Sequence, residues 1–574
     1  MPYGLNLKDM YTKEKCFISG YKGTGKTALL LYLENYFYKE NPKTITVFIP
    51  FKENYNEAKR KNMVYSAQRI VSTISIDKSA QIDNQDFEYI WAMEIFKKII
   101  EANGINHGIL FEKNESWKAF RSTIKKIEKD KNILKYVLIP SITYTPSSSQ
   151  QISITASIKP EEIENTQAYQ QFITLIDMAF SEFEKLDRTK TPFYIFIDEL
   201  EAYYGNQEIF TRDLRMIRDL IIIVKRFNTI FWKNKNFHTK IICGFRTEIM
   251  HAINTQIISK EINKTIGGFE VPLKWNYNNT NSIEHPIMKI LLRRIQIAEH
   301  NNGHDYSEIE IYNKWFPEKS IEGQNLVSFI LNNTWNKPRD IVRLLMVAQD
   351  SIKGTSSKFT RDVFDACLKD YSKKSLEEIR EEMLATYSSD KIEEILNPLK
   401  GYRVTFTKEE LMKHLEDNYE DSIFLHKLGQ VLKDLYRLGI IGNYSHVSDS
   451  YHWQHKGDEG PLYSNEWQLQ IHRALWGAML ISKRHDDAIN KIRDSENQLI
   501  GNIYEVNVVE IKKDHINVSF TIDSQVYYGI IFIKDIAEEF VVDIESYVWI
   551  GEKIRAKVLR YDMSHGIWIL SKNI

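Results

Sequence analysis

The sequence is poor in cysteine and has no excess of charge of either sign. Three of its 574 residues are cysteines, and 76 basic side chains stand against 77 acidic ones. Cys16, Cys243 and Cys367 lie far apart, which excludes a disulfide framework and a four-cysteine zinc site and fits a reducing compartment. The balanced charge gives no whole-chain signal for nucleic acid or an anionic membrane, so any such surface has to be local.

Long apolar runs are also missing. The longest aliphatic run covers residues 220–224, which is too short to span a bilayer, and the first residues show no basic segment followed by an apolar core. We therefore expect a cytoplasmic protein with no membrane partner. The length predicts roughly three to five domains, and an apolar fraction of 43% is enough for ordinary cores.

A glycine-rich loop follows a short apolar segment near the N-terminus. Residues 20–27 read Gly-Tyr-Lys-Gly-Thr-Gly-Lys-Thr, which is the spacing of a Walker A motif between a strand and a helix. Glycines permit the tight turn that brings successive N–H groups to phosphate oxygens at a helix N-terminus, where anions are already favoured. The motif therefore predicts a nucleotide site.

The residue types of this loop predict individual roles. We expect Lys26 to reach the β- and γ-phosphates and the hydroxyl of Thr27 to ligate Mg²⁺. The remaining phosphate contacts are expected from Gly20, Lys22, Gly23, Thr24 and Gly25.

Two acidic residues follow the apolar strand predicted at residues 193–197. Asp198 stands where a carboxylate at the carboxyl end of a strand can hold Mg²⁺ through its water shell, and Glu199 is expected to orient or deprotonate the attacking water. An acid pair in this place is by itself also an ordinary strand end or helix cap. Downstream of a complete Walker A motif, it favours a Walker B motif.

A later strand, residues 240–245, ends in an arginine. The guanidinium of Arg246 is suited to sensing a γ-phosphate, because its fixed donors lose their partner when the phosphate leaves. Strand patterns also occur at residues 44–50 and 268–273, with helical patterns between the strands. The order predicts an α/β fold with a parallel sheet and a site at its carboxyl edge.

Residues 20–27, 193–199 and 241–246 together resemble the STAND and AAA+ classes of P-loop ATPases. The arginine at the strand end is more similar to STAND proteins than to typical AAA+ proteins. The resemblance implies ATP hydrolysis with catalytic roles for Lys26, Glu199 and Arg246. One departure is a mostly helical insertion at residues 51–190, far longer than an ordinary connection.

The region that follows resembles the lid of these ATPases. Pro338 matches the proline that packs near the base, and Arg339 matches a sensor-2 arginine, although Asn336 replaces the glycine of the family's GxP motif. A plain surface arginine is an equal alternative for Arg339. Arg293 and Arg294 are weaker candidates for phosphate contact.

Two further units are expected after the lid. A helix that begins with a capping pattern at residues 406–411 and a second helix at 423–438, followed by a two-stranded wing, resemble a winged-helix domain. The second helix has a poor basic face for DNA, so the resemblance favours a domain that closes over the nucleotide. Five short strands after residue 500 predict a small barrel that resembles an S1-type OB fold. The family's aromatic pair is replaced in this barrel. The aromatic candidates for stacking that remain are Tyr527, Tyr528, Phe532 and Trp568.

The expected domains are a P-loop core at 1–280 with the insertion at 51–190, a helical lid at 281–374, a winged-helix-like domain at 375–482, a linker at 483–499 and an S1-like barrel at 500–574. The first functional hypothesis is a nucleotide-dependent molecular switch, by class association in bacterial stress or antiphage defence. The alternative is a nucleic-acid-binding ATPase that uses the winged-helix and barrel domains on DNA or RNA. A protein partner for the C-terminal domains and homo-oligomerisation are further expectations. The helix after the acid pair carries three arginines that form either a solvated helix face or a trans arginine finger. They are Arg212, Arg215 and Arg218.

Overall fold

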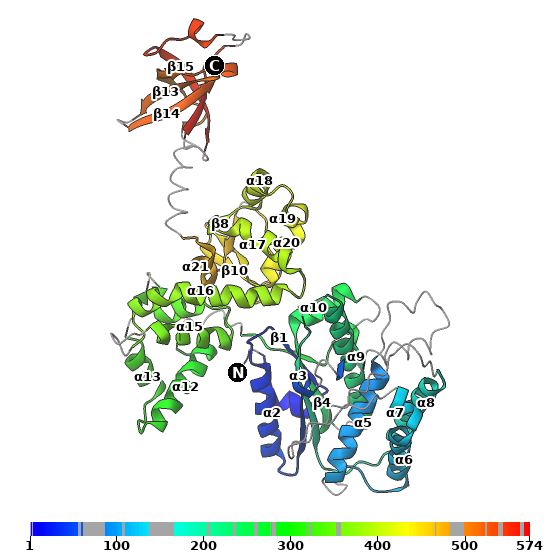
Figure 1. The fold of residues 1–574 in the computed structure, drawn as a ribbon. Coiled ribbons are helices and arrows are strands. Elements are labelled where there is room, and N and C mark those ends of the chain that lie inside the picture. The colour runs from blue at the N-terminus through cyan, green and yellow to red at the C-terminus, as the bar shows by residue number, and fades with distance from the viewer. Residues whose placement is uncertain are drawn as a thin grey trace, which may run out of the picture. The chain divides into compact units, whose positions relative to one another are not determined.

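The structure is a computed structural model (Figure 1). It describes residues 2, 4–54, 59–60, 63, 87–105, 110–136, 166–203, 207–233, 237–257, 262–275, 277, 283–317, 320–321, 324–351, 358–464, 466–482, 499–522, 525–537, 543–562 and 567–573. The chain divides into two compact units. The first unit is Met1–Leu399 with Phe406–Met479, and the second is Lys400–Thr405 with Leu480–Ile574.

The first unit is built on a five-stranded sheet in which all paired strands are parallel. Its strand order is β2-β3-β4-β1-β5. The strands are β1 (Phe17–Gly20), β2 (Ile45–Pro50), β3 (Phe193–Leu200), β4 (Thr239–Arg246) and β5 (Glu270–Pro272). The central strands β1, β3 and β4 are buried along nearly their whole length, as parallel strands covered on both faces are. The predicted parallel α/β sheet is confirmed, and it is consistent with a P-loop-like core.

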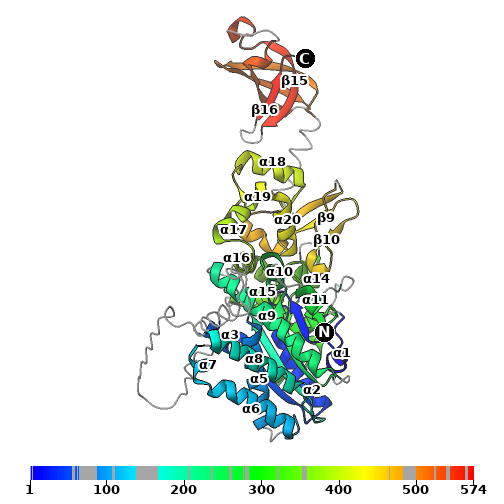
Figure 2. The same ribbon diagram turned by 90° about the vertical axis from the view of Figure 1, so that its right-hand side faces the viewer.

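Helices cover both faces of this sheet (Figures 1 and 2). Side chains of β3 alternate between the faces, so that Tyr194 and Phe196 pack with α2, whereas Ile195 and Ile197 share a cluster with α9. The helices of this part are α1 (Leu7–Thr12), α2 (Lys26–Glu40), α3 (Phe51–Asn54), α9 (Gln207–Phe231), α10 (Thr247–Gln256) and α11 (Ile262–Ile266).

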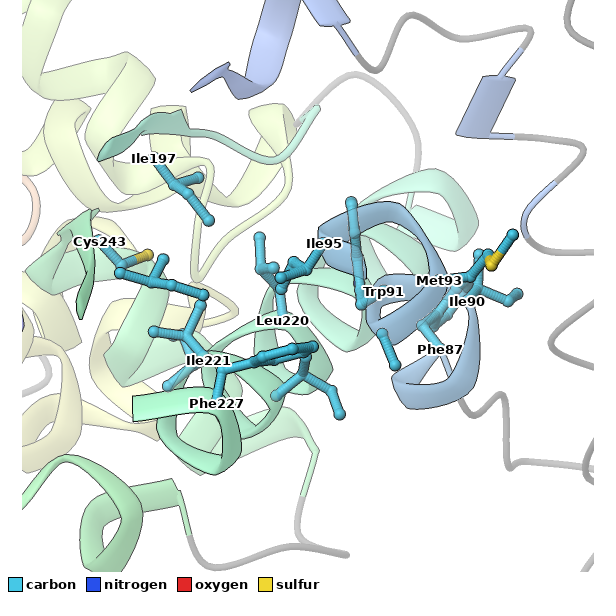
Figure 3. Packing of buried hydrophobic residues seen from close by; sticks show 14 of the residues in the cluster. Phe87, Ile90, Trp91, Met93, Ile95, Ile197, Leu220, Ile221, Phe227 and Cys243 are labelled. Carbon is cyan, nitrogen blue, oxygen red and sulfur yellow. The ribbon is translucent and has the colours of Figure 1, made fainter. Parts of the chain in front are cut away.

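The described part of the insertion packs on α9 and shares its hydrophobic core. Figure 3 shows Trp91 and Ile95 of the insertion beside Leu220 of α9, in a cluster that extends to Ile197 of the sheet. The indole Nε1 of Trp91 donates to the carbonyl of Met216 over 3.0 Å. The insertion helices are α5 (Glu88–Ile105), α6 (Glu115–Lys129), α7 (Lys131–Tyr136) and α8 (Thr166–Phe183). The polar stretch at 145–150, predicted to be a loop, lies outside the described residues.

A helical region follows the sheet, at the position expected for a lid. It consists of α12 (Pro286–Asn301), α13 (Glu308–Trp315), α14 (Leu326–Asn332), α15 (Pro338–Ser351) and α16 (Arg361–Met383), with a short ladder of β6 (Ser320–Ile321) and β7 (Gln324–Asn325). Helix α16 continues through residue 374, the boundary expected between the lid and the winged-helix-like domain. The continuation is held by apolar side chains on its buried side, including Leu376, Ile379 and Met383.

The last part of the first unit combines short helices with an antiparallel ladder. The helices are α17 (Ser389–Leu396), α18 (Lys408–Asn418), α19 (Ile423–His426), α20 (Leu428–Arg437) and α21 (Trp476–Met479). The strands β9 (Ile441–Ser445), β10 (Ser450–His452) and β11 (Trp467–Ile471) pair antiparallel, while β8 (Thr405–Phe406) lies where the two units divide. The single helix expected at 423–438 is wrong, because the backbone leaves the helical region at Lys427, with φ −123°.

The second unit contains a closed barrel of order β12-β13-β14-β16-β15. Its strands are β12 (Ile503–Ile511), β13 (His515–Ile522), β14 (Gln525–Phe532), β15 (Lys553–Asp562) and β16 (Ile567–Ser571). Alternate residues such as Val506, Val518 and Val558 fill the interior, which confirms the five-stranded barrel predicted from the alternating pattern. Gly529 allows β14 to approach β16, since a Cβ there would lie 2.3 Å from the Leu570 side chain.

Candidate functional site

A cavity of about 650 Å³ opens at the carboxyl edge of the parallel sheet. Its wall contains the predicted residues Lys22, Gly23, Thr24, Gly25, Lys26, Thr27, Asp198, Glu199, Arg246, Pro338 and Arg339. Gly20 is the exception among the predicted residues and does not line the cavity. It ends β1, and its carbonyl accepts a hydrogen bond from Lys26. Residues more than 300 positions apart in the sequence thus meet at one place, and the volume falls in the range of small-molecule sites.

The glycine loop, residues 20–27, depends on glycine at two positions. Gly23 and Gly25 have φ values of 84° and 92°, in the left-handed region that other residues rarely adopt. Gly23 also lies against the lid-like region, since a Cβ there would be 2.9 Å from the Cβ of Arg339. Helix α2 begins at Lys26, so its N-terminal N–H groups and dipole face the cavity, as an anion site requires.

Lys26 is turned toward its own loop. Its Nζ donates to the carbonyls of Gly20 and Tyr21 over 2.7 and 2.9 Å. Burial lowers the pKa of Lys26 to about 8, and the nearby carboxylate of Glu248 offsets part of that shift. The ammonium is therefore poorly solvated and held by two neutral acceptors.

The two acids lie where β3 breaks its pairing with β4. The β3–β4 register shifts between Ile197 and Leu200, and Glu199 adopts a φ of 60°, which is rare for a residue with a side chain. Asp198 is 2% exposed, and its Oδ2 has no hydrogen-bond partner. Gly244 of β4 leaves room for this carboxylate, because a Cβ there would be 3.3 Å from Asp198 Oδ1.

Arg246 ends β4 and is held by acids. Its guanidinium contacts Glu201, which follows β3, and lies 3.8 Å from the carboxylate of Glu248 on α10. Glu248 is 1% exposed, and neither of its carboxylate oxygens has a hydrogen-bond partner. Neither Glu201 nor Glu248 was singled out from the sequence.

Helix α15 begins directly on the glycine loop. Pro338 is its first residue, and the backbone N–H of Arg339 donates to the carbonyl of Gly23 over 3.3 Å. The Arg339 guanidinium is half-exposed and forms an ion pair, since its Nη1 lies 3.2 Å from Glu378 of α16. Lys22 of the loop contacts Glu381 and lies 3.7 Å from Glu378.

Apolar and aromatic side chains line the rest of the cavity. They are Pro2, Tyr32, Trp275, Ile290 and Val342. Trp275, just after β5, is fixed by a hydrogen bond from its Nε1 to the carbonyl of Thr24 over 3.1 Å. Trp275 was not predicted from the sequence. Its position close after the fifth strand, at the edge where the site was expected, was the signal that could have indicated it. Arg294 lines the cavity, whereas Arg293 is exposed and bonds to Gln296.

The arginines of α9 are not at this cavity. Arg212 and Arg218 are 7% and 3% exposed and pair with the adjacent Asp213 and Asp219. Arg60 of the insertion shares Asp213 over 2.6 Å. For Arg212 and Arg218, a solvated helix face is therefore wrong, and burial leaves neither of them available as a trans arginine finger.

The barrel has a cationic strip on its outer face, formed by Lys553, Arg555 and Lys557. These alternate residues of β15 are exposed, and the adjacent Trp549 is 67% exposed. Of the aromatic residues expected to stack bases, Trp568 is only 5% exposed and Tyr527 stacks on Phe520, whereas Tyr528 is exposed.

Two absences concern only the part of the chain that the structure describes. No helix there combines the length and apolarity needed to cross a bilayer. No group of three or more His, Cys, Asp or Glu side chains there is arranged to hold a metal ion.

Comparison with known proteins gives partial matches. A search of curated proteins finds no match. Among solved structures, the chain is similar to the solution structure of GSP13 from Bacillus subtilis, at 24% identity over 13% of this chain and 55% of that chain, with a TM-score of 0.12. It is also similar to the a/eIF2alpha-aDim2p-rRNA complex from Pyrococcus horikoshii OT3, at 23% identity over 12% of this chain and 42% of that chain, with a TM-score of 0.11. The chain thus spans about half the length of the solved structures it matches. Residues 286–380, from the start of α12 into α16, match the FunZ-associated C-terminal helical domain.

Proposed function

We propose that this protein is an ATP-hydrolysing P-loop ATPase of the STAND/AAA+ class that acts as a nucleotide-dependent switch. One observation carries the proposal. A single cavity brings together the lysine of the glycine loop, the acid pair near the end of β3, the arginine that ends β4 and the arginine in the first turn of α15. Separate chance occurrences of these motifs would not place them on one wall.

Each group of cavity residues has its own role in this proposal. The loop N–H groups and Lys26 bind the β- and γ-phosphates, Glu199 orients the attacking water, and Arg246 stabilises charge on the transferred phosphoryl group. Asp198 and Thr27 supply the oxygen donors that Mg²⁺ prefers, and the unpartnered Oδ2 of Asp198 supports this assignment. Mg²⁺, when bound, neutralises phosphate charge. The apolar wall with Trp275 and Pro338 suits a purine base.

The switch follows from contacts between the loop and later parts of the first unit. Lys22 reaches α16, Arg339 bonds to Gly23, and the Gln454 amide donates to the Tyr21 hydroxyl over 3.0 Å. Gln454 belongs to the region that resembles a winged helix. A change at the γ-phosphate would therefore act directly on both the lid and the winged-helix region.

We place this switch in a defence-related system, such as bacterial antiphage or stress signalling. The match of residues 286–380 to the FunZ-associated C-terminal helical domain supports this placement. The test is infection of cells that carry the wild-type gene or the Lys26→Ala variant. Protection that requires Lys26 would support the placement, and equal plaque counts with both genes would contradict it.

Phosphate release from ATP by the full-length protein tests the enzyme activity. Lys26→Ala should abolish ATP binding and turnover. Glu199→Gln should keep ATP binding and lose turnover, because the isosteric amide is uncharged, accepts a weaker hydrogen bond from water and cannot deprotonate it. Glu208→Gln, at the start of α9 and away from the cavity wall, is the matched control. Normal hydrolysis by Glu199→Gln would remove the assigned water-positioning role.

A second candidate function is a nucleic-acid-binding ATPase, and the cationic strip of the barrel favours it. Alternate residues of one strand lie about 6.6 Å apart, so its three cations can follow the backbone of an extended single strand while Trp549 offers a ring for stacking. Glu505 on β12 pairs with Lys553 over 2.9 Å and reduces the positive charge of the strip.

Binding of labelled single-stranded RNA, single-stranded DNA and duplex DNA to the full-length protein tests this candidate. Replacing Lys553, Arg555 and Lys557 with Gln should weaken single-strand binding and reduce the salt slope by about 2. Replacing Lys512, Lys513 and Lys534 with Gln is the control for loss of charge. No binding at low salt would contradict the candidate, and ATP turnover stimulated by one nucleic acid would favour it over a protein-reporting switch.

Homo-oligomerisation stays an expectation from the resemblance. Mass photometry with and without ATP tests it. Assembly that depends on ATP and Lys26 would support an oligomeric switch, whereas one unchanged monomer in both conditions would count against it.

A further inference from the structure

Two acids on α16 hold two cations of the nucleotide cavity. We call Glu378 and Glu381 the acidic clasp. Lys22 contacts Glu381 and lies 3.7 Å from Glu378, and the Arg339 guanidinium lies 3.2 Å from Glu378. Lys22 and Arg339 both line the cavity, so the clasp binds the same side chains that are expected to meet the phosphates.

The two acids of the clasp differ in their exposure to water. The side chains of Lys22 and Glu378 are only 18% and 15% exposed, whereas those of Arg339 and Glu381 are 51% and 62% exposed. Ion pairs are screened less when they are partly buried, so the ion pairs of Glu378 are stronger than that of Glu381. A carboxylate and a phosphate oxygen use the same donors of a guanidinium or an ammonium, and they therefore compete for Lys22 and Arg339.

Glu378 can release both cations without remaining unpaired. It also contacts Arg343, which lies on α15 and does not line the cavity. Arg343 in turn lies 3.4 Å from Asp340, so it stays fixed on its own helix. An uncompensated buried carboxylate is costly, and the Arg343 contact removes that cost when a phosphate takes over the other two cations.

The backbone keeps Arg339 within reach of the phosphates. Its N–H bonds to the Gly23 carbonyl, so the Cα of Arg339 lies beside the glycine loop even though its guanidinium is directed to α16. A rotation of the side chain is enough to change partners. The other side of α16 is buried, with Leu376 and Met383 among its buried residues. Release of the clasp therefore changes the contacts on one side of a helix whose other side stays packed.

We propose that Glu378 and Glu381 are positioning residues that hold Lys22 and Arg339 on α16 until the phosphates of the nucleotide replace them. The exchange makes α16 the element that responds to an occupied cavity. This inference rests on the proposed nucleotide site and adds the acids that oppose nucleotide binding, which no motif in the sequence marks.

Equilibrium binding of ATP, ADP and AMP to the full-length protein tests the inference. Glu378→Gln removes the competing charge, so we expect the Kd for ATP to fall about threefold to tenfold, with a smaller fall for ADP and none for AMP. Glu377→Gln is the matched control, because this exposed neighbour on α16 loses the same charge. The KM for ATP should fall in parallel with the Kd while kcat changes little.

A purely structural role for Glu378 predicts the opposite sign, with weaker ATP binding and a lower Tm. Arg339→Ala combined with Glu378→Gln should lose most of the gain, because one released cation is then missing. Glu381→Gln, at a mostly exposed position, provides a variant that will not depend on core packing, and it should lower the Kd for ATP about twofold.

The outcomes separate the inference from the proposed function. ATP binding that requires Lys26 but is equally strong in the Glu378→Gln, Glu381→Gln and Glu377→Gln variants would overturn the clasp alone. Weaker ATP binding by Glu378→Gln with unchanged binding by Glu381→Gln would overturn it as well. Absence of Lys26-dependent ATP binding in the wild-type protein would overturn both.

Discussion

The affinity for ATP should decrease as the pH rises above about 8, because Lys26 loses its charge in the empty site. Burial lowers the pKa of Lys26 to about 8 in the free protein, whereas the phosphates of a bound nucleotide favour the ammonium form. If the bound phosphates restore the ordinary lysine pKa of about 10.5, the only loss is in the free protein, where the charged fraction falls roughly 30-fold from pH 7 to pH 9.5. This fall corresponds to about 2 kcal/mol of binding free energy. Below about pH 7.5 the affinity should be nearly constant.

Isothermal titration calorimetry with ATP in buffers of different ionisation enthalpy measures this directly. Near pH 9, binding should take up close to one proton, since Lys26 is mostly neutral before ATP arrives and charged afterwards. The phosphates of ATP are already ionised over this range. Lys26→Arg keeps its charge and should show a flat Kd. A Kd for the wild-type protein that does not change up to pH 9.5, or that changes as much in Lys26→Arg, would refute the argument from Lys26.

Two stability predictions follow from other parts of the structure. Burial lowers the pKa of Lys240 to about 7, well below its unfolded value of about 10.5, so unfolding takes up a proton between these values and the free energy of unfolding should rise with pH by up to about 1.4 kcal/mol per unit. Urea denaturation at several pH values checks this, and Lys240→Met should show a smaller slope; a stability that falls with pH from 7 to 9 would contradict it. Gly529→Ala should destabilise the barrel by about 2 kcal/mol, because its Cβ would lie 2.3 Å from Leu570 Cδ1 and 2.9 Å from the Trp568 carbonyl. Gly429→Ala on α20, where a Cβ meets no atom within 4 Å, is the control and should be neutral or mildly stabilising in the same denaturation assay.

The elements that were predictable have strong local signals. The apolar runs of β1, β3 and β4 show a buried parallel sheet, and the alternation in β12 to β16 shows a barrel, because in both cases the pattern along the strand reports its own burial. The motifs at Lys26, Asp198 and Arg246 end or follow strands, so sheet topology brings them to one edge. Their meeting in one cavity follows from these local signals together with the parallel topology that they imply.

The acids around the site were not predictable in the same way. Glu378 lies more than 350 residues from Lys22, on a helix whose pattern marks an ordinary amphipathic surface. Only the packing of α16 against the loop gives this glutamate its partners. Arg212 and Arg218 were expected on an exposed face, since arginines at helical spacing usually lie on the solvent side of a helix, but both are buried. Here the insertion covers α9, and carboxylates at adjacent positions neutralise the buried guanidinium groups.

The shared core between the insertion and the sheet limits how this protein can be shortened. Phe87 and Trp91 belong to the same buried cluster as Ile197, the residue directly before Asp198 (Figure 3). Truncation of the insertion would expose the outer face of α9 and leave Asp213 without Arg60. A minimal ATPase cut from this chain therefore has to keep the insertion helices, or replace the apolar face of α9 with polar residues.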